Sequence, residues 1–133
     1  MRLFVRLLGL VVLLAVAVMG LQMVAAESGE VVVLRTTNAA GQIEETRLWV
    51  VDDAGHAWLR SGSPTSGWFV RLQQQPDVEV VRAGTPSAWR AVPQPEARDH
   101  INDLMRAKYG WADAYIGMLF GRDDAIPIRL DPR

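Results

Sequence analysis

Few side chains in this 133-residue sequence have the type and spacing that catalysis or metal binding requires. The sequence has no cysteine, which excludes disulfides, thiolate metal sites and a cysteine nucleophile. His56 and His100 are not paired at ligand spacing, so we expect no metal site. The acidic pairs at 52–53 and 123–124 are typical of solvated turns, and no serine lies in a nucleophile-elbow pattern. The catalytic residues, if there are any, are therefore unknown from the sequence.

The charge balance also excludes a class of partner. Lysine and arginine total 14 and aspartate and glutamate total 15, which gives a net charge of −1. A protein that binds nucleic acid through bulk positive charge needs an excess of basic residues. Half of the residues are hydrophobic, which excludes a disordered tail. We therefore expect a folded domain with no nucleic-acid partner.

Residues 1–26 are predicted to be a transmembrane anchor or a signal peptide. Arg2 and Arg6 lie at the start, and the run from Leu7 to Ala26 carries no charge. A helix of that length spans about 30 Å, the thickness of the hydrocarbon core of a bilayer. The run either stays in the membrane or is cleaved after its small residues near Ala26, which would leave a secreted protein. In both cases the positive-inside rule places residues 27–133 outside the cytoplasm.

Residues 27–133 have the pattern of short strands followed by a helix. Strands are predicted at Val31–Thr37, Gln42–Val51, His56–Arg60, Val78–Arg82, Ala88–Val92 and Ala125–Leu130. The imperfect alternation in Gln42–Val51 predicts a strand that is covered on both sides.

The helices are fewer than the strands. Two helical turns are predicted from Trp68 to Gln75, a longer helix between Pro93 and Gly110, and a short helix from Trp111 to Phe120. The expected fold class is mainly β (α+β): a small antiparallel barrel with one longer helix in its C-terminal half, preceded by a single hydrophobic N-terminal helix.

Three sets of stretches share their order and spacing with a known family. They are 32–37 with 46–50, then 59–62 with 68–69 and 75–80, and finally 105–111 with 126–130. This order resembles the split β-barrel superfamily of flavin-binding proteins, whose type member is pyridoxamine 5′-phosphate oxidase. It is nearest the deazaflavin-dependent nitroreductase-like branch. The resemblance covers most of residues 31–132.

The resemblance implies a cofactor site. In that family a basic strand residue contacts the cofactor phosphate, Ser and Gly after the next strand help to hold the cofactor, and an aromatic residue of a short helix packs nearby. By position these residues are Arg47, Arg60, Ser61, Gly62 and Trp68. Arginine matches phosphate oxygens two at a time, and a glycine turn exposes backbone N–H donors.

The sequence departs from the family pattern in two places. The first turn holds Asn38-Ala39-Ala40, where the deazaflavin branch usually carries basic residues. Glu44 and Glu45 stand where the family often has arginine or lysine, and two acids near a phosphate would repel it. Either Arg47 and Arg60 carry all of the phosphate charge, or the cofactor is absent.

The same residues have structural interpretations. Arg47 can form an ion pair with Glu45 or Glu79, and Arg60 at a strand end is expected to be exposed and to contribute little to stability. Trp68 can be plain core. Three tryptophans are expected to pack the barrel: Trp49, Trp58 and Trp89.

Two functions follow from these expectations. The resemblance implies a membrane-associated reductase that uses a deazaflavin coenzyme of the F-420 type or FMN and passes a hydride to a quinone, nitro compound or similar small-molecule acceptor. It also implies a homodimer, because family members often pair. The alternative is a cofactor-free barrel that binds a small apolar ligand or a protein partner at the cell envelope. In either case residues 7–26 would supply the contact with the membrane, and whether the protein is an enzyme stays open.

Overall fold

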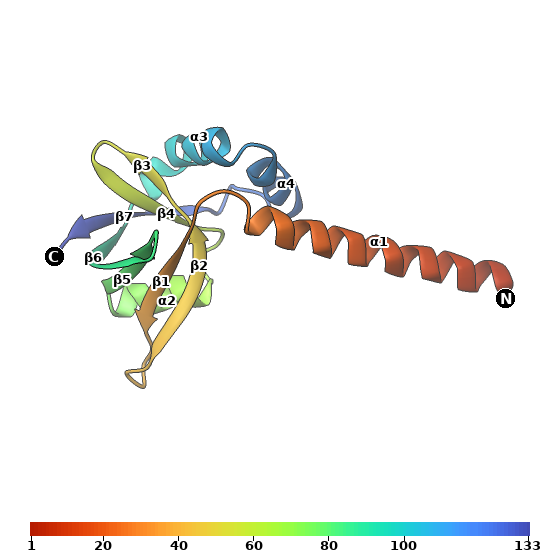
Figure 1. The fold of residues 1–133 in the computed structure, drawn as a ribbon, viewed down its shortest axis with the longest axis horizontal. Helices are drawn as coiled ribbons and strands as arrows, with labels where there is room; N and C mark the ends of the chain where they lie inside the picture. Colours follow the sequence, from red (N-terminus) through yellow and green to blue (C-terminus); the bar gives the residue numbers. More distant parts are fainter.

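The computed structural model describes residues 1–133 as a long helix attached to a small barrel domain (Figure 1). The elements in chain order are α1 (Arg2–Ala26), β1 (Val31–Thr37), β2 (Ile43–Trp49), β3 (Val51–Asp53), β4 (His56–Ser61), α2 (Gly67–Gln74), β5 (Asp77–Arg82), β6 (Thr85–Pro93), a 3-10 turn (Pro95–Ala97), α3 (Arg98–Tyr109), α4 (Trp111–Phe120) and β7 (Ile126–Pro132). The predicted class is confirmed: an antiparallel sheet with an apolar helix before it and helices in its C-terminal half.

The seven strands form one antiparallel sheet in the order β2-β1-β5-β6-β7-β4-β3. β2 and β3 lie at opposite edges of this order, yet only Val50 separates them in the chain. The chain bends at Val50, so that one continuous segment connects both edges. This bend curls the sheet into a split barrel.

The expectation of a strand covered on both sides between Gln42 and Val51 is wrong for its first half. β2 pairs only with β1, and its first three residues are exposed, including Ile43 at 61%. Charged side chains such as Glu44 and Glu45 are typical of an edge strand, where they discourage pairing with other chains. The imperfect alternation therefore reflects an exposed edge followed by a bend.

Two hairpins turn through the same dipeptide. Ala54 and Gly55 connect β3 to β4, and Ala83 and Gly84 connect β5 to β6. The φ angles are +50° and +81° in the first turn and +50° and +78° in the second. Turns with two positive φ angles match the right-handed twist of paired strands, and glycine adopts them without steric cost. The acidic pair at 52–53, which the sequence places in a turn, therefore lies in β3 directly before the turn.

Two apolar clusters lie on opposite faces of the curled sheet. The barrel interior holds Val32, Leu34, Val50, Leu59, Trp68, Phe69, Leu72, Val78, Val80, Ala91, Ile128 and Leu130. The outer cluster, under α3, holds Val51, Trp58, Ile101, Met105 and Tyr109. Because successive strand residues point to opposite faces, the neighbours Val50 and Val51 belong to different clusters.

The three strand tryptophans divide between these clusters. Trp89 packs against the barrel interior, as expected. Trp58 and Trp49 instead belong to or pack on the outer cluster beneath α3. The expectation that all three pack the barrel is wrong because two of them occupy strand positions that face outward.

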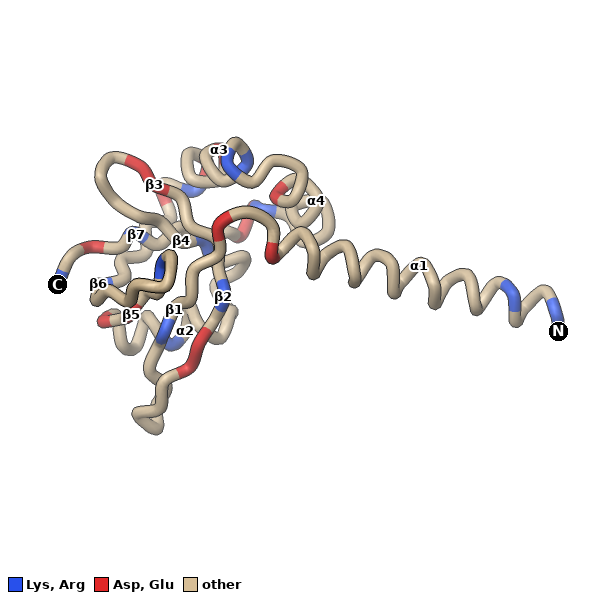
Figure 2. The backbone as a smooth tube through the Cα atoms, viewed as in Figure 1, with Lys and Arg blue, Asp and Glu red and all other residues tan.

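α1 extends away from the domain, and only its C-terminal end packs against α4 (Figure 1). No charged residue lies between Arg6 and Glu27 (Figure 2). The helix is long and apolar enough to cross a membrane, and none of its most apolar stretch is buried in the protein. A signal sequence has the same properties, so this exposed helix fits an anchor or a signal.

Candidate functional site

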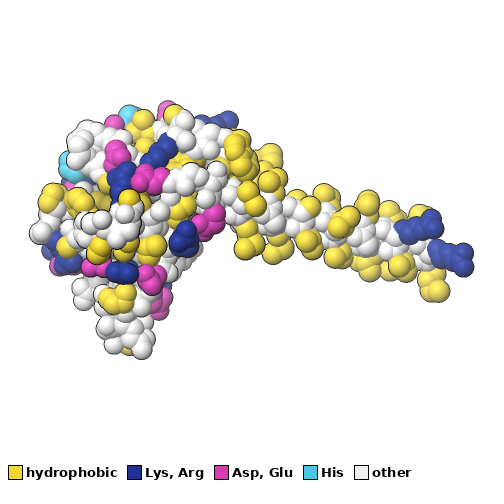
Figure 3. All heavy atoms as spheres, in the orientation of Figure 1, with side chains coloured by type: hydrophobic (Ala, Val, Ile, Leu, Met, Phe, Trp, Pro, Cys, Tyr) yellow, Lys and Arg dark blue, Asp and Glu magenta, His cyan; other side chains and the backbone are white.

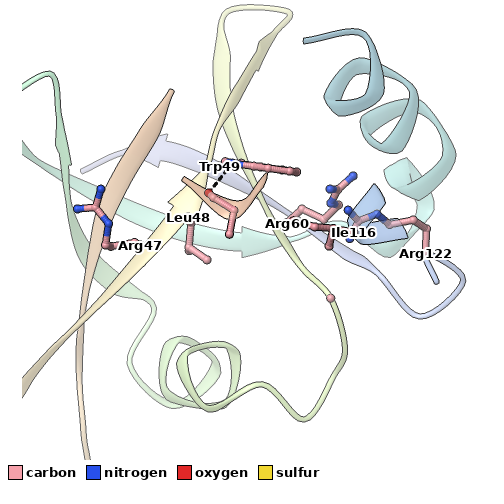
Figure 4. A pocket seen from close by; sticks show the side chains of 8 residues that line it. Arg47, Leu48, Trp49, Arg60, Ile116 and Arg122 are labelled. Carbon is pink, nitrogen blue, oxygen red and sulfur yellow. Dashed lines mark hydrogen bonds between the residues drawn. The ribbon is translucent and has the colours of Figure 1, made fainter. Parts of the chain in front are cut away.

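A small pocket opens where the end of α1 meets β2, β4 and α4 (Figure 4). Its volume is about 160 Å³. The residues that line it are Ala26, Arg47, Leu48, Trp49, Arg60, Gly62, Ile116 and Arg122. Three arginines and no acidic residue line the pocket, so its walls favour an anion.

Arg60 and Arg122 share one carboxylate at the inner end of the pocket. Nη2 of Arg60 donates to Oδ1 of Asp113 at 2.5 Å, and Nη2 of Arg122 donates to the same oxygen at 2.8 Å. The side chains of Arg60 and Asp113 are each only 5% exposed. Nη1 of Arg60 also donates to Oδ1 of Asn102 at 3.2 Å. Two cations against one anion leave this buried cluster with an excess positive charge.

Arg122 has an unused donor in this cluster. Its Nε is buried and has no hydrogen-bond partner. Burial lowers the pKa of Arg122, and the neighbouring charge of Arg60 lowers it further. An oxyanion in the pocket beside Arg60 and Arg122 would neutralise the excess charge. The inner end of the pocket is therefore suited to a phosphate or carboxylate group.

Arg47 lies at the outer end of the pocket in a different environment. Its Nε and Nη2 donate to the two carboxylate oxygens of Glu27 at 2.9 and 2.7 Å. This hydrogen bonding lowers the pKa of Glu27. The Arg47 side chain is 60% exposed, and its guanidinium points away from Arg60 and Arg122 (Figure 4). Its charge is therefore already matched by one carboxylate.

The acidic residues of β2 lie elsewhere. Glu45 accepts from Arg35 at 3.1 Å, and Arg35 also binds Glu79. Glu44 pairs with Arg71 at 3.1 Å. The expected pairing of Arg47 with Glu45 or Glu79 is therefore wrong, because Arg35 on the neighbouring strand takes both acids. Neither glutamate of β2 lines the pocket, so no repulsion of a bound phosphate arises there.

The five residues of the predicted cofactor site separate into two groups. Arg47, Arg60 and Gly62 line the pocket. The Ser61 side chain is fully buried, and its Oγ donates to the carbonyl oxygen of Ser63 at 2.7 Å. Trp68 lies in the barrel interior, edge-on to a neighbouring ring with centroids 6.4 Å apart. The last two residues therefore do not line the pocket.

Sequence reasoning missed Asp113 and Arg122, which complete the cluster. Asp113 is the only charged residue of α4, and a lone charge in an apolar helix must be paired when it is buried. That isolated aspartate is a signal that could have been recognised. Arg122 follows Gly121 at the end of the helix and carries no comparable signal.

A second group of polar and charged side chains lies beside the outer cluster, around Tyr109 and Glu30. Oη of Tyr109 accepts from the N–H of Val50 at 3.0 Å and donates to the carbonyl oxygen of Glu30 at 2.6 Å. The Glu30 carboxylate accepts from Arg82 and Lys108, and these hydrogen bonds lower the pKa of Glu30. These contacts connect the start of β1 to the end of α3.

A second pocket, of about 300 Å³, lies beside the β5–β6 hairpin. Its apolar wall consists of Val50, Ala57, Val80, Ala83, Trp89 and Leu130. Glu30 and Arg82 line it as well, but they are already paired with each other. This pocket is therefore suited to an apolar molecule rather than to an anion.

Comparison of the chain with known proteins places this architecture. No protein-family model matches the sequence, and no curated protein matches it. A structure described as the heme storage protein HutZ from Vibrio cholerae superposes with a TM-score of 0.62 at 15% identity, over 82% of this chain and 85% of that one. The chain has the split β-barrel fold.

Other split β-barrel structures also match it. One is described as an F420-H2 dependent reductase, with a TM-score of 0.56 at 21% identity over 74% of this chain and 92% of that one. Another is described as a domain-swapped dimer, with a TM-score of 0.57 at 21% identity over 75% of this chain and 78% of that one. The predicted split β-barrel resemblance is confirmed as a likeness of fold, and proteins with this fold include reductases and dimers.

Proposed function

We propose that the protein is a membrane-anchored oxidoreductase. In this proposal its pocket holds the phosphate of a deazaflavin coenzyme (F420 type) or of FMN, and a hydride passes to a quinone, nitro compound or similar acceptor. The observation that carries the proposal is the pair Arg60 and Arg122, which line the pocket and share the single carboxylate of Asp113, so that the cluster keeps an excess positive charge. The F420-dependent reductases among the structures with the same fold support this choice of cofactor.

The residues of the pocket fit the anionic end of such a cofactor. Arg60 and Arg122 would hold the phosphate, and Gly62 leaves open space because no atom lies within 4 Å of the place of a Cβ. Ligand pockets that enclose a whole small molecule measure about 300–1,000 Å³. At about 160 Å³ this pocket has room for the phosphate end only, so we place the rest of the cofactor at the open face, where the partner in a homodimer would cover it.

The protein's own contribution is binding and orientation. When bound, the cofactor supplies the hydride chemistry, which agrees with the lack of an acid–base pair in the pocket. Arg60 is held by Asp113 and Asn102, so its guanidinium has a fixed orientation before any ligand arrives. Leu48 and Ile116 give the pocket apolar walls that exclude water around the anion.

We also propose that residues 1–26 remain attached to residues 27–133 as an anchor. Ala25 is completely buried, and Oη of Tyr115 donates to the carbonyl oxygen of Val18 at 3.0 Å. Nε1 of Trp49 donates to the carbonyl oxygen of Ala26 at 3.0 Å. Cleavage near Ala26 would remove these contacts, so they favour the anchor over a cleaved signal. The positive-inside rule then places the domain outside the cytoplasm.

A second candidate function is supported by the apolar pocket beside the β5–β6 hairpin. Its volume of about 300 Å³ reaches the range of small-molecule sites. In this candidate the barrel binds a small apolar ligand at the cell envelope and holds no cofactor. Trp89 in the wall of that pocket would report such binding by its fluorescence.

One titration separates the two candidates. The full chain is purified in detergent and titrated with F420 and with FMN, with the cofactor fluorescence as the signal and inorganic phosphate as competitor. The proposal expects saturable binding of one cofactor and its reversal by phosphate. Binding of neither cofactor, together with a change in tryptophan fluorescence that an apolar probe causes in wild type but not in Trp89→Phe, would favour the cofactor-free barrel.

A further inference from the structure

α4 has an exposed apolar surface that the barrel does not use. Four large apolar side chains of this ten-residue helix are exposed: Trp111 at 55%, Met118 at 75%, Leu119 at 38% and Phe120 at 66%. The only charged residue of α4, Asp113, points inward to Arg60. Exposed apolar side chains gathered on one short helix mark an interaction site in soluble proteins.

The same helix packs along the end of α1. Oη of Tyr115, in the middle of α4, donates to the carbonyl oxygen of Val18 at 3.0 Å. In Figure 3 the hydrophobic side chains of α1 continue onto the part of the domain where α4 lies. The exposed surface of α4 is therefore continuous with that of the helix that we propose as the membrane anchor.

The length of α1 fixes the depth of this contact. α1 has 25 residues, and a hydrocarbon core of about 30 Å takes about 20 of them. The charge-free stretch of that length is Leu7–Ala26, because a stretch that ended earlier would place Arg6 in the hydrocarbon. At about 1.5 Å per residue, Val18 then lies roughly 12 Å inside the outer edge of the hydrocarbon. Helices that lie in a bilayer interface are buried to about 5–10 Å, so α4, which reaches Val18 through the Tyr115 side chain, lies close to that depth.

We infer that α4 is an interfacial membrane helix whose exposed side chains, Trp111, Met118 and Phe120 among them, contact lipid. The inference rests on the proposed anchor. Trp111 at one end of the helix has the amphipathic ring that is enriched at membrane interfaces. No charged side chain of α4 opposes burial in lipid, because Asp113 is paired inside the domain.

This placement gives the pocket a membrane-facing opening. Ile116 of α4 and Ala26 of α1 both line the pocket, so its mouth lies at the level of the lipid headgroups. An acceptor dissolved in the bilayer, with an apolar tail and a polar head, can reach the open face beside the pocket, where we place the rest of the cofactor, without crossing water. The substrate class that this geometry favours is therefore a lipid-soluble molecule such as a quinone.

Spin labelling tests the inference directly, because the chain has no cysteine and a single introduced cysteine is unique. The variants are Met118→Cys and Phe120→Cys, with Ala40→Cys in the exposed β1–β2 turn as the aqueous control and Leu10→Cys as the anchor control. Each full-length variant is reconstituted into phosphatidylcholine vesicles and labelled with a nitroxide. Collision rates with oxygen, which concentrates in lipid, are compared with those of a water-soluble nickel complex.

The expected result is that labels at positions 118, 120 and 10 collide preferentially with oxygen, while the label at 40 collides preferentially with nickel. If the labels at 118 and 120 collided preferentially with nickel, as the label at 40 does, while the label at 10 collided preferentially with oxygen, the inference would be overturned and the anchor would stand. A label at 10 in water would overturn the anchor itself. Spin–spin broadening between copies at 118 would show that a second copy covers α4, which also overturns the lipid contact.

Discussion

The two ends of the pocket hold arginines of the same chemistry in opposite circumstances. Arg47 at the outer end is 60% exposed and pairs with the single carboxylate of Glu27. Arg60 at the inner end is 5% exposed and shares the carboxylate of Asp113 with a second arginine. At the outer end the charges match, whereas at the inner end a cation remains without a partner. The charge that an arginine can offer to a ligand is therefore set by its partners and its burial.

The same contrast affects stability. Exposed ion pairs contribute about 0–1 kcal/mol, because water screens them and ordering the side chains costs entropy. Removing one partner of a buried pair costs about 3–5 kcal/mol, because a charge is left without compensation. The inner cluster is therefore expected to be sensitive to substitution and the outer pair tolerant of it.

The largest effect is expected from Asp113→Asn, which removes the carboxylate between two buried guanidinium groups. We expect the free energy of unfolding to fall by about 3–5 kcal/mol, because Arg60 and Arg122 then repel each other without screening. Glu27→Gln is the matched control and should lower it far less, because water screens this exposed pair. Denaturant unfolding of the full chain in detergent measures both. Similar losses for the two variants would contradict the contrast between the two ends.

A smaller effect is expected from Arg60→Ala. The expectation that this strand-end arginine is exposed is wrong, because α4 covers it, and its hydrogen bonds to Asp113 and Asn102 would be lost. Asp113 keeps its pair with the second arginine, so we expect a loss of about 1–3 kcal/mol in the free energy of unfolding. Arg47→Ala should lose less than about 1 kcal/mol. A loss for Arg60→Ala no larger than that for Arg47→Ala would show that the inner pair is solvated.

The smallest effect concerns pH. Hydrogen bonds from Arg47 hold the pKa of Glu27 below its ordinary value of 4.5, so the charged form stabilises the folded state. This contribution is complete above the unfolded pKa and is lost as the pH falls through the lower folded pKa. The difference in unfolding free energy between wild type and Glu27→Gln should therefore be complete above the ordinary pKa of Glu27 and shrink as the pH falls below it. Glu96→Gln, at an exposed residue that forms no ion pair, is the control.

Local patterns in the sequence predict the elements well. The helix expected at Trp111–Phe120 is α4, and the strand expected at Val31–Thr37 is β1. Both depend on residues within a few positions of one another, through side-chain periodicity and turn chemistry. The family resemblance, which depends on the order of such local stretches, also predicted Arg60 and Gly62 as site residues, and both line the pocket.

Contacts between distant elements could not be predicted in this way. Asp113 is 53 positions from Arg60, and the two meet only because α4 packs over the end of β4. Glu27 is 20 positions from Arg47, and they meet because the end of α1 returns to the edge of β2. The imperfect alternation within 42–51 likewise fits a covered strand as well as an edge strand followed by a bend, so it could not predict the bend at Val50. The charge of the site depends on these contacts between distant elements. The sequence therefore predicts Arg60 and Gly62 but not Asp113 and Arg122.

The most direct measurement of the central claim is a calorimetric titration of the full chain with F420 and FMN, for wild type, Arg122→Ala and Arg47→Ala. A charge-assisted hydrogen bond contributes roughly 1.5–3 kcal/mol, so Arg122→Ala should weaken binding of the preferred cofactor by about ten- to a hundredfold. Arg47→Ala should weaken it by less than about fivefold, because Glu27 already occupies that guanidinium. Equal affinities for wild type and Arg122→Ala, or a larger loss for Arg47→Ala, would contradict the assignment of the anion to the inner end of the pocket.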